Sequence, residues 1–182
     1  VTVAALACMM SLGHHRGIYP KLETILVYPG AYVGRVRRRA AWGMEVEGDV
    51  RAGESWTRGP VVLAWEDALA QARGEDIGHN VIVHEFAHQL DQEDGFADGA
   101  TDDRNGAADL REVLAEEFEE EDEGYSDGYE ENLLDDYGKE NMAEAFAVAS
   151  EMFFEVPEEM QERHPRLYEK LKEYYGLDTA GW

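Results

Sequence analysis

The sequence predicts an α+β fold, in which a small sheet forms early in the chain and helices make up most of the remainder. Two observations indicate this fold class. Short runs rich in β-branched and aromatic residues lie at 21–33 and 59–65. Longer segments with apolar residues at helical spacing come after them, notably at 80–94 and 141–155. Strands followed by helices are typical of α+β domains.

Length and composition are consistent with one folded domain. A chain of 182 residues with 44% hydrophobic residues can bury a sizeable core. We expect this single domain to cover 1–182 and to lack its natural N-terminal part, because the sequence begins with Val1 inside an apolar run. The lone cysteine, Cys8, excludes an internal disulfide and fits a reducing, cytoplasmic location.

The charge of the chain limits its partners. A formal net charge of −24 repels nucleic acid and anionic membranes, so we expect neither as a direct partner. This acidity fits a protein that works in high salt, or it reflects the composition of the proteome of origin. The charge alone does not separate these two interpretations.

The first part of the chain contains the predicted strands. Residues 1–12 predict a buried helix that includes Cys8 and is too short to span a bilayer. The strand at 21–33 is expected to end at Pro29-Gly30. The segment MEVEGDVRAG (44–53) predicts a hairpin with Gly48-Asp49 at its turn. The strand at 59–65 has contiguous apolar residues, which predicts burial on both faces and offers an edge to which an extended substrate adds.

The later segments predict helices. A short helix at 66–74 ends at Gly74, and Asn80 is a suitable N-cap for a helix that runs to about Asp94. The segment from Leu110 begins as a helix and becomes an acidic run. The strongest helix is 141–155, which carries an apolar stripe and ends before Pro157, with further helix to about Tyr175.

The segment NVIVHEFAHQLD (80–91) contains the candidate site. His84 and His88 lie one turn apart on one helical face, as two ligands of a tetrahedral zinc ion require. Glu85 lies about 100° around the helix, where a carboxylate takes a proton from a zinc-activated water. HExxH on a helix is the signature of this arrangement.

A zinc-free helix with packed histidines is the main alternative interpretation. The surrounding residues are apolar, so two histidines and a glutamate buried there need partners, because burying unpaired polar groups is costly. This context favours the zinc site. The candidate ligands are therefore His84 and His88, and the candidate general base is Glu85.

The third ligand is left open by spacing. Asp94 lies six residues after His88, but the short-range architecture needs glycine where Asp91 stands, so we expect the helix to continue. Glu144 and Glu151 lie seven residues apart, near one face of the later helix. Glu144 also fits a capping box with Asn141, and Glu151 also fits a group that supports a ligand, so both remain candidates.

Three segments together resemble the family of Mlc titration factor A. They are NVIVHEFAHQLDQEDGFADG, ILVYPGAYV and YGKENMAEAFAVASEMFF, and the resemblance extends from about Ala5 to about Pro157. Members of that family are DgsA anti-repressors and zinc-dependent peptidases, related in their catalytic core to the protease domain of anthrax lethal factor. The resemblance implies a zincin-like metallopeptidase domain, with the HExxH helix at the active site and a zinc cofactor.

The resemblance also implies roles for particular residues. The family's third ligand corresponds to Glu144, and a tyrosine that is thought to stabilise the oxyanion corresponds to Tyr137. Asp91 is interpreted as a helix-anchoring group or a group that supports a ligand. The implied partners are a peptide substrate and a transcriptional repressor of the Mlc type. Aminopeptidase action is one option, and a non-enzymatic anti-repressor with a structural zinc is the alternative.

Overall fold

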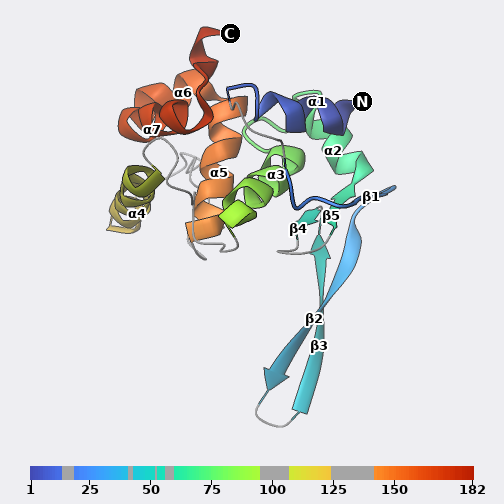
Figure 1. Cartoon of the computed structure of the whole chain (residues 1–182). Coiled ribbons are helices and arrows are strands. Elements are labelled where there is room, and N and C mark those ends of the chain that lie inside the picture. The colour runs from blue at the N-terminus through green and yellow to red at the C-terminus, as the bar shows by residue number, and fades with distance from the viewer. Residues whose placement is uncertain (14–18, 41–42, 52, 56–59, 95–106, 124–141) are drawn as a thin grey trace.

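The computed structural model describes residues 1–13, 19–40, 43–51, 53–55, 60–94, 107–123 and 142–182. Within 32–55, at 94, 107–108 and 119–123, it describes the backbone alone. The order of elements is α1 (Thr2–Met9), β1 (Ile25–Tyr28), β2 (Tyr32–Ala40), β3 (Gly43–Arg51), β4 (Gly53–Ser55), β5 (Val61–Ala64), α2 (Trp65–Gln71), α3 (Val81–Asp91), η1 (Gln92–Asp94), α4 (Ala107–Glu123), α5 (Met142–Glu155), α6 (Pro157–Arg163), α7 (Pro165–Tyr175) and η3 (Thr179–Gly181). Strands precede most of the helices, so the predicted α+β class is confirmed (Figure 1).

Within the part of the chain that the structure describes, the sheet next to the helices has three strands in the order β1-β5-β4. β1 and β5 are parallel, whereas β4 and β5 are antiparallel. All four residues of β5 are buried, as its contiguous apolar pattern predicts. Because β5 has a strand on each side, the prediction that a substrate adds to its edge is wrong. The ends of this sheet are β1 and β4.

A long two-stranded ribbon extends away from this sheet (Figure 1). β2 and β3 pair in antiparallel register from Tyr32↔Arg51 to Ala40↔Gly43. Gly48 and Asp49 lie inside β3, opposite Arg35 and Gly34, so the predicted turn at Gly48-Asp49 is wrong. A Gly-Asp pair is a local turn signal, and here a ladder of backbone hydrogen bonds along both strands overrides it.

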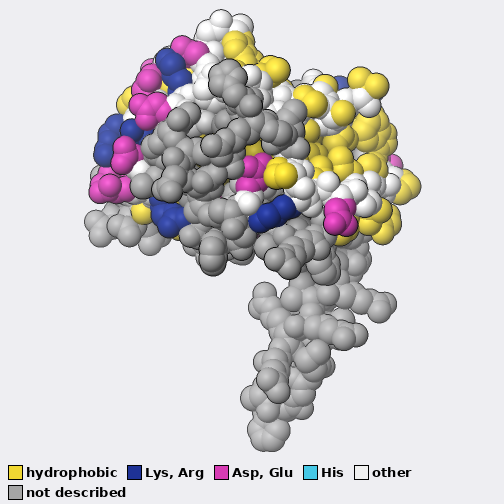
Figure 2. Space-filling model, in the orientation of Figure 1, with side chains coloured by type: hydrophobic (Ala, Val, Ile, Leu, Met, Phe, Trp, Pro, Cys, Tyr) yellow, Lys and Arg dark blue, Asp and Glu magenta, His cyan; other side chains and the backbone are white. Residues whose placement is uncertain are grey.

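The N-terminal segment is less buried than its composition predicts. α1 is a helix, but Ala7 is its only buried residue. Cys8 is exposed, so its interpretation as a buried hydrophobe is wrong. A run that is apolar on every side gives no indication of which face packs, and α1 packs on α3 along one side only. The four residues of β1 are exposed as well, and Figure 2 shows hydrophobic side chains gathered on this part of the surface.

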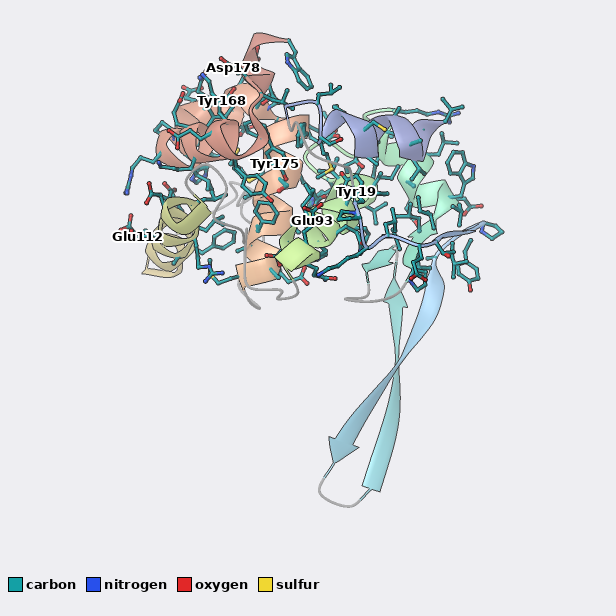
Figure 3. The ribbon with its side chains drawn as sticks, viewed as in Figure 1. Tyr19, Glu93, Glu112, Tyr168, Tyr175 and Asp178 are labelled. Carbon is teal, nitrogen blue, oxygen red and sulfur yellow. The ribbon has the colours of Figure 1, made fainter. Side chains whose placement is uncertain are left out.

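The core lies between α3, α5 and α7. α5 buries one continuous run from Ala145 to Phe153, and Phe153 packs against Tyr168 and Tyr175 of α7. The hydroxyl of Tyr175 donates a hydrogen bond to Ser150 Oγ at 2.7 Å. Figure 3 shows Tyr175 between α7 and α5. α5 is therefore fixed on the side away from α3 by aromatic packing.

The ends of the helices agree with the predicted signals. Pro157 and Pro165 stand at the first turns of α6 and α7, so the predicted stop after α5 and the helix to Tyr175 are confirmed. Gly176 ends α7 with a φ of 64°, a conformation that glycine adopts at low cost. Among the described helices, none has both the length and the apolarity of a membrane span.

Candidate metal centre

The candidate site lies where α3 and α5 pack together. α3 starts as predicted at Asn80, whose side-chain oxygen accepts hydrogen bonds from the amides of Ile82 and Val83 at 3.1 and 3.2 Å. The helix continues through Asp91, as the missing glycine predicts. Nearly all of its residues are buried, so its polar side chains lie within the protein rather than on its surface.

Two sets of polar residues face each other along these helices. Asn80, His84 and His88 recur every four residues on the α3 side, and on α5 the facing residues are Glu144, Glu151 and Glu155. Helical rotation keeps each set within a narrow stripe. We call these six residues the α3–α5 polar seam. Its two ends differ, because His84, His88 and Glu144 form one end and Asn80 with Glu155 forms the other.

The first end brings three potential ligand atoms together. Nε2 of His84 lies 3.2 Å from Nε2 of His88 and 3.2 Å from Oε2 of Glu144. Nε2 of His88 lies 3.4 Å from Oε1 of Glu144. Ligands that surround zinc tetrahedrally at about 2.0–2.1 Å lie about 3.3–3.4 Å from one another. Each imidazole Nε2 has this spacing to the other Nε2 and to one oxygen of Glu144, and one ligand atom from each residue lies within 4.8 Å of the other two. Two imidazoles and a carboxylate gathered in this way fit a zinc ion.

Glu151 has a different position from Glu144. Its Oε1 lies 2.6 Å from Nδ1 of His84, on the opposite side of the imidazole ring from the donor group. Its Oε2 accepts a hydrogen bond from the backbone amide of Asn80 at 2.6 Å. The structure thus brings Glu144 to the nitrogens that face each other and Glu151 to the far nitrogen of one histidine. Spacing alone did not distinguish these two positions.

The charges at the seam depend on these contacts. Burial disfavours the imidazolium of His84, but hydrogen bonds with Glu144 and Glu151 outweigh burial and raise its pKa to about 10. Burial raises the pKa of Glu144, but contacts with His84 and His88 outweigh it and hold that pKa well below its usual range. Without a metal, the two carboxylates therefore stabilise a positive charge on His84, in the place where a cation would bind.

The donor group is partly open to solvent. The side chains of His84, His88 and Glu144 are 19%, 11% and 22% exposed, whereas that of Glu151 is 8% exposed. Glu85 is buried on the same helix, and its charge contributes to the raised pKa of His84, so its carboxylate lies close to the site. Among the described residues, the only group suited to a metal consists of these three donors. Three donors leave a position for water or substrate.

The remaining predicted residues lie apart or outside the description. Tyr137 and Asn141 lie outside the described residues, so the oxyanion role and the capping box stay predictions. The side chain of Asp94 is not described, and its backbone ends η1. Asp91 is fully buried, and its charge adds to the effect of burial in raising the pKa of Tyr175. This electrostatic interaction with Tyr175, at the end of α7, is consistent with a helix-anchoring role.

Sequence reasoning missed the second end of the seam. The side-chain amide of Asn80 donates a hydrogen bond to Oε1 of Glu155 at 2.7 Å, and Gln71 Oε1 accepts one from the amide of Val81 at 2.8 Å. The signal for Glu155 was present, because it lies one turn after Glu151 on an otherwise apolar helix. The sequence gives no comparable indication for Gln71, because this residue lies on α2 and its contact with α3 depends on how the two helices pack.

The sequence matches the model of one protein family and is similar to several known proteins. The family model of the glucose-regulated metallo-peptidase M90 matches residues 1–176. An uncharacterised protein of Synechocystis sp. is 40% identical over 185 residues, covering 98% of this chain and 66% of that protein. Mlc titration factor A of Pectobacterium atrosepticum is 32% identical, covering 93% of this chain and 64% of its own length. The Serratia proteamaculans protein of the same name is 33% identical, with coverages of 85% and 60%. The chain thus spans less than two thirds of the length of these relatives.

Proposed function

Because the chain belongs to the glucose-regulated metallo-peptidase M90 family, we propose that it is a zinc-dependent metallopeptidase that hydrolyses peptide bonds. The observation that carries this proposal is the spacing of the donor groups of His84, His88 and Glu144. The Nε2 atoms of the two histidines lie 3.2 Å apart, and each lies 3.2–3.4 Å from one of the two carboxylate oxygens of Glu144. Two imidazoles and one carboxylate are one of the protein ligand sets of open catalytic zinc sites. Such a zinc ion supplies Lewis acidity and lowers the pKa of water towards ~7.

In this proposal the protein's own groups move the proton and orient the substrate. Glu85 accepts a proton from the attacking water and then donates it to the leaving amine, which is general base and general acid catalysis by one carboxylate. The hydroxyl of Tyr137 donates a hydrogen bond to the oxyanion that forms from the peptide carbonyl, as the family resemblance implies. Burial of Glu85 beside His84 supports its part in this scheme.

An extended substrate fits the sheet at β4 better than at β5. β5 lies between two strands, whereas β4 stands at the end of the three-stranded sheet and packs against α3. A peptide that adds a strand there would pass beside the helix that carries the histidines. We therefore propose β4 as the strand that binds the peptide backbone.

The partner and the location belong to the same proposal. The name Mlc titration factor A, shared by two of the relatives, supports a transcriptional repressor of the Mlc type as a second binding partner. A protein that acts on a repressor works in the cytoplasm. We propose that the protein acts as an aminopeptidase. Endopeptidase action is the alternative that the experiment tests.

The decisive experiment measures metal content and peptide hydrolysis together. Wild-type protein is expected to contain about one zinc ion per chain and to cleave members of a panel of short peptides with free or blocked N-termini. Glu85→Gln is expected to keep its zinc and lose activity by about 10²–10⁴-fold. Glu112→Gln, which changes an exposed glutamate of α4, is the matched control and is expected to keep both.

The outcomes separate the proposals. Full activity of Glu85→Gln would exclude Glu85 as the general base. Cleavage of peptides with blocked N-termini would exclude a strict aminopeptidase. A protein that binds zinc but cleaves none of the panel, while it binds the repressor, would favour the non-enzymatic anti-repressor.

A further inference from the structure

The far nitrogen of His84 is the starting point for a new inference. We propose that Glu151 is a positioning residue that directs Nε2 of His84 to the metal and, with the same carboxylate, fixes the start of α3. This inference rests on the proposed zinc site, because it assigns a role towards that metal. Glu151 itself contacts neither the metal position nor the substrate.

The contact with His84 determines which nitrogen faces the donor group. An imidazole can present either nitrogen to a metal, and the hydrogen bond made by the other nitrogen decides between them. Nδ1 of His84 donates a short, charge-assisted hydrogen bond to Oε1 of Glu151 at 2.6 Å. Nε2 then lies 3.2 Å from both His88 Nε2 and Glu144 Oε2. The ring is thus oriented before any metal binds.

The second oxygen of Glu151 is bound as well. Oε2 accepts a hydrogen bond from the backbone amide of Asn80 at 2.6 Å, and the side chain of Glu151 is 8% exposed. A carboxylate with both oxygens bound and little access to solvent has little freedom to rotate. Because Asn80 is the N-cap of α3, one side chain of α5 fixes both the start of that helix and the ring of the first histidine.

Glu155 provides a matched comparison on the same helix. It also accepts a hydrogen bond from Asn80, through the side-chain amide at 2.7 Å, and it lies four residues after Glu151. The structure records no contact between Glu155 and either histidine among its described hydrogen bonds and ion pairs. Removal of either carboxylate weakens the attachment of Asn80 to α5. Only removal of Glu151 frees the ring of His84.

The test measures zinc affinity by competition with a chromophoric chelator, in wild type, Glu151→Ala, Glu151→Gln and Glu155→Ala. We expect Glu151→Ala to weaken zinc binding by about 10–100-fold. Glu151→Gln keeps an oxygen for the Nδ1 hydrogen and is expected to recover part of this loss. Glu155→Ala is expected to bind zinc as tightly as wild type, although the metal-free forms of both alanine variants melt at lower temperature.

A second readout reports the geometry of the site. Cobalt(II) that replaces zinc is expected to give a different visible absorption spectrum in Glu151→Ala than in wild type, and an unchanged spectrum in Glu155→Ala. Equal zinc affinity in wild type and Glu151→Ala, or equal weakening in the two alanine variants, would overturn the positioning role. If Glu151→Ala does not fold, judged by circular dichroism of the metal-free protein, Glu151→Gln decides the matter. A wild type that takes up no zinc would overturn the proposed metal site, and this inference with it.

Discussion

Replacement of Asn80 by alanine is predicted to destabilise the helix that carries both histidines. The side chain of Asn80 accepts hydrogen bonds from two backbone amides and donates one to Glu155, and the residue is 0% exposed. Loss of an N-cap costs about 0.5–2 kcal/mol, and loss of a hydrogen bond to a charged group costs about 1.5–3 kcal/mol. We therefore expect Asn80→Ala to lower the free energy of unfolding by about 2–5 kcal/mol.

The assay is urea unfolding of the metal-free protein, monitored by circular dichroism and repeated as a thermal melt. For a chain of this size, about 1 kcal/mol corresponds to about 2–4 °C, so the melting temperature should fall by about 4–20 °C. Asn80→Ser keeps a capping oxygen but cannot donate to Glu155 as the amide does, and it should lie between the other two proteins. A loss below about 0.5 kcal/mol in Asn80→Ala would refute the reasoning, because it would show that the buried cap is replaced by other groups.

Further predictions concern protons and the core. Zinc binding at pH 7 should release about one proton, because the pKa of about 10 keeps His84 protonated in the metal-free form. Calorimetry in buffers of different ionisation enthalpy measures the number of protons released. Release of no proton would contradict the prediction. The same raised pKa stabilises the metal-free fold fully below pH 6.5, and this contribution should disappear as the pH rises through 10, which urea unfolding across that range measures. Hydrogen bonds from Lys172 and then Tyr168 lower the pKa of Asp178 below its usual 3.8. Its stabilising contacts should therefore persist above pH 3.8 and disappear only as the pH falls through the lowered pKa. An NMR titration of the Asp178 carboxyl with a midpoint at or above pH 3.8 would exclude this. Phe153→Ala should cost about 3–5 kcal/mol in urea unfolding, since the ring is 0% exposed, and a loss below about 1 kcal/mol would show that the core closes around the gap.

The elements that were predicted correctly are those with local signals. Asn80 marks the start of α3, and Pro157 marks the end of α5, because caps and prolines act on the backbone within a few residues. Contiguous apolar residues likewise indicated the buried strand β5. The errors occurred where packing decides. Nothing in the composition around Cys8 shows that α1 leaves it exposed, and the Gly48-Asp49 signal is overridden by a long strand pairing.

The candidate site was predicted in part for the same reason. Helical geometry alone placed His84, Glu85 and His88 on one segment, and α3 has that form. The choice between Glu144 and Glu151 depends on how two helices approach each other, which spacing within one helix does not contain. Family resemblance favoured Glu144, and the structure brings that residue to the two imidazole nitrogens that face each other.

The α3–α5 polar seam also restricts how the length of α5 can vary. A residue inserted or deleted between Glu144 and Glu151 would rotate one of them by about 100° relative to the other. Contacts at both ends of the seam, with the histidines and with Asn80, would then not form together. Insertions and deletions within this stretch of α5 are therefore expected to be excluded, whereas the ribbon of β2 and β3 extends away from the helices and can change in length without altering this register.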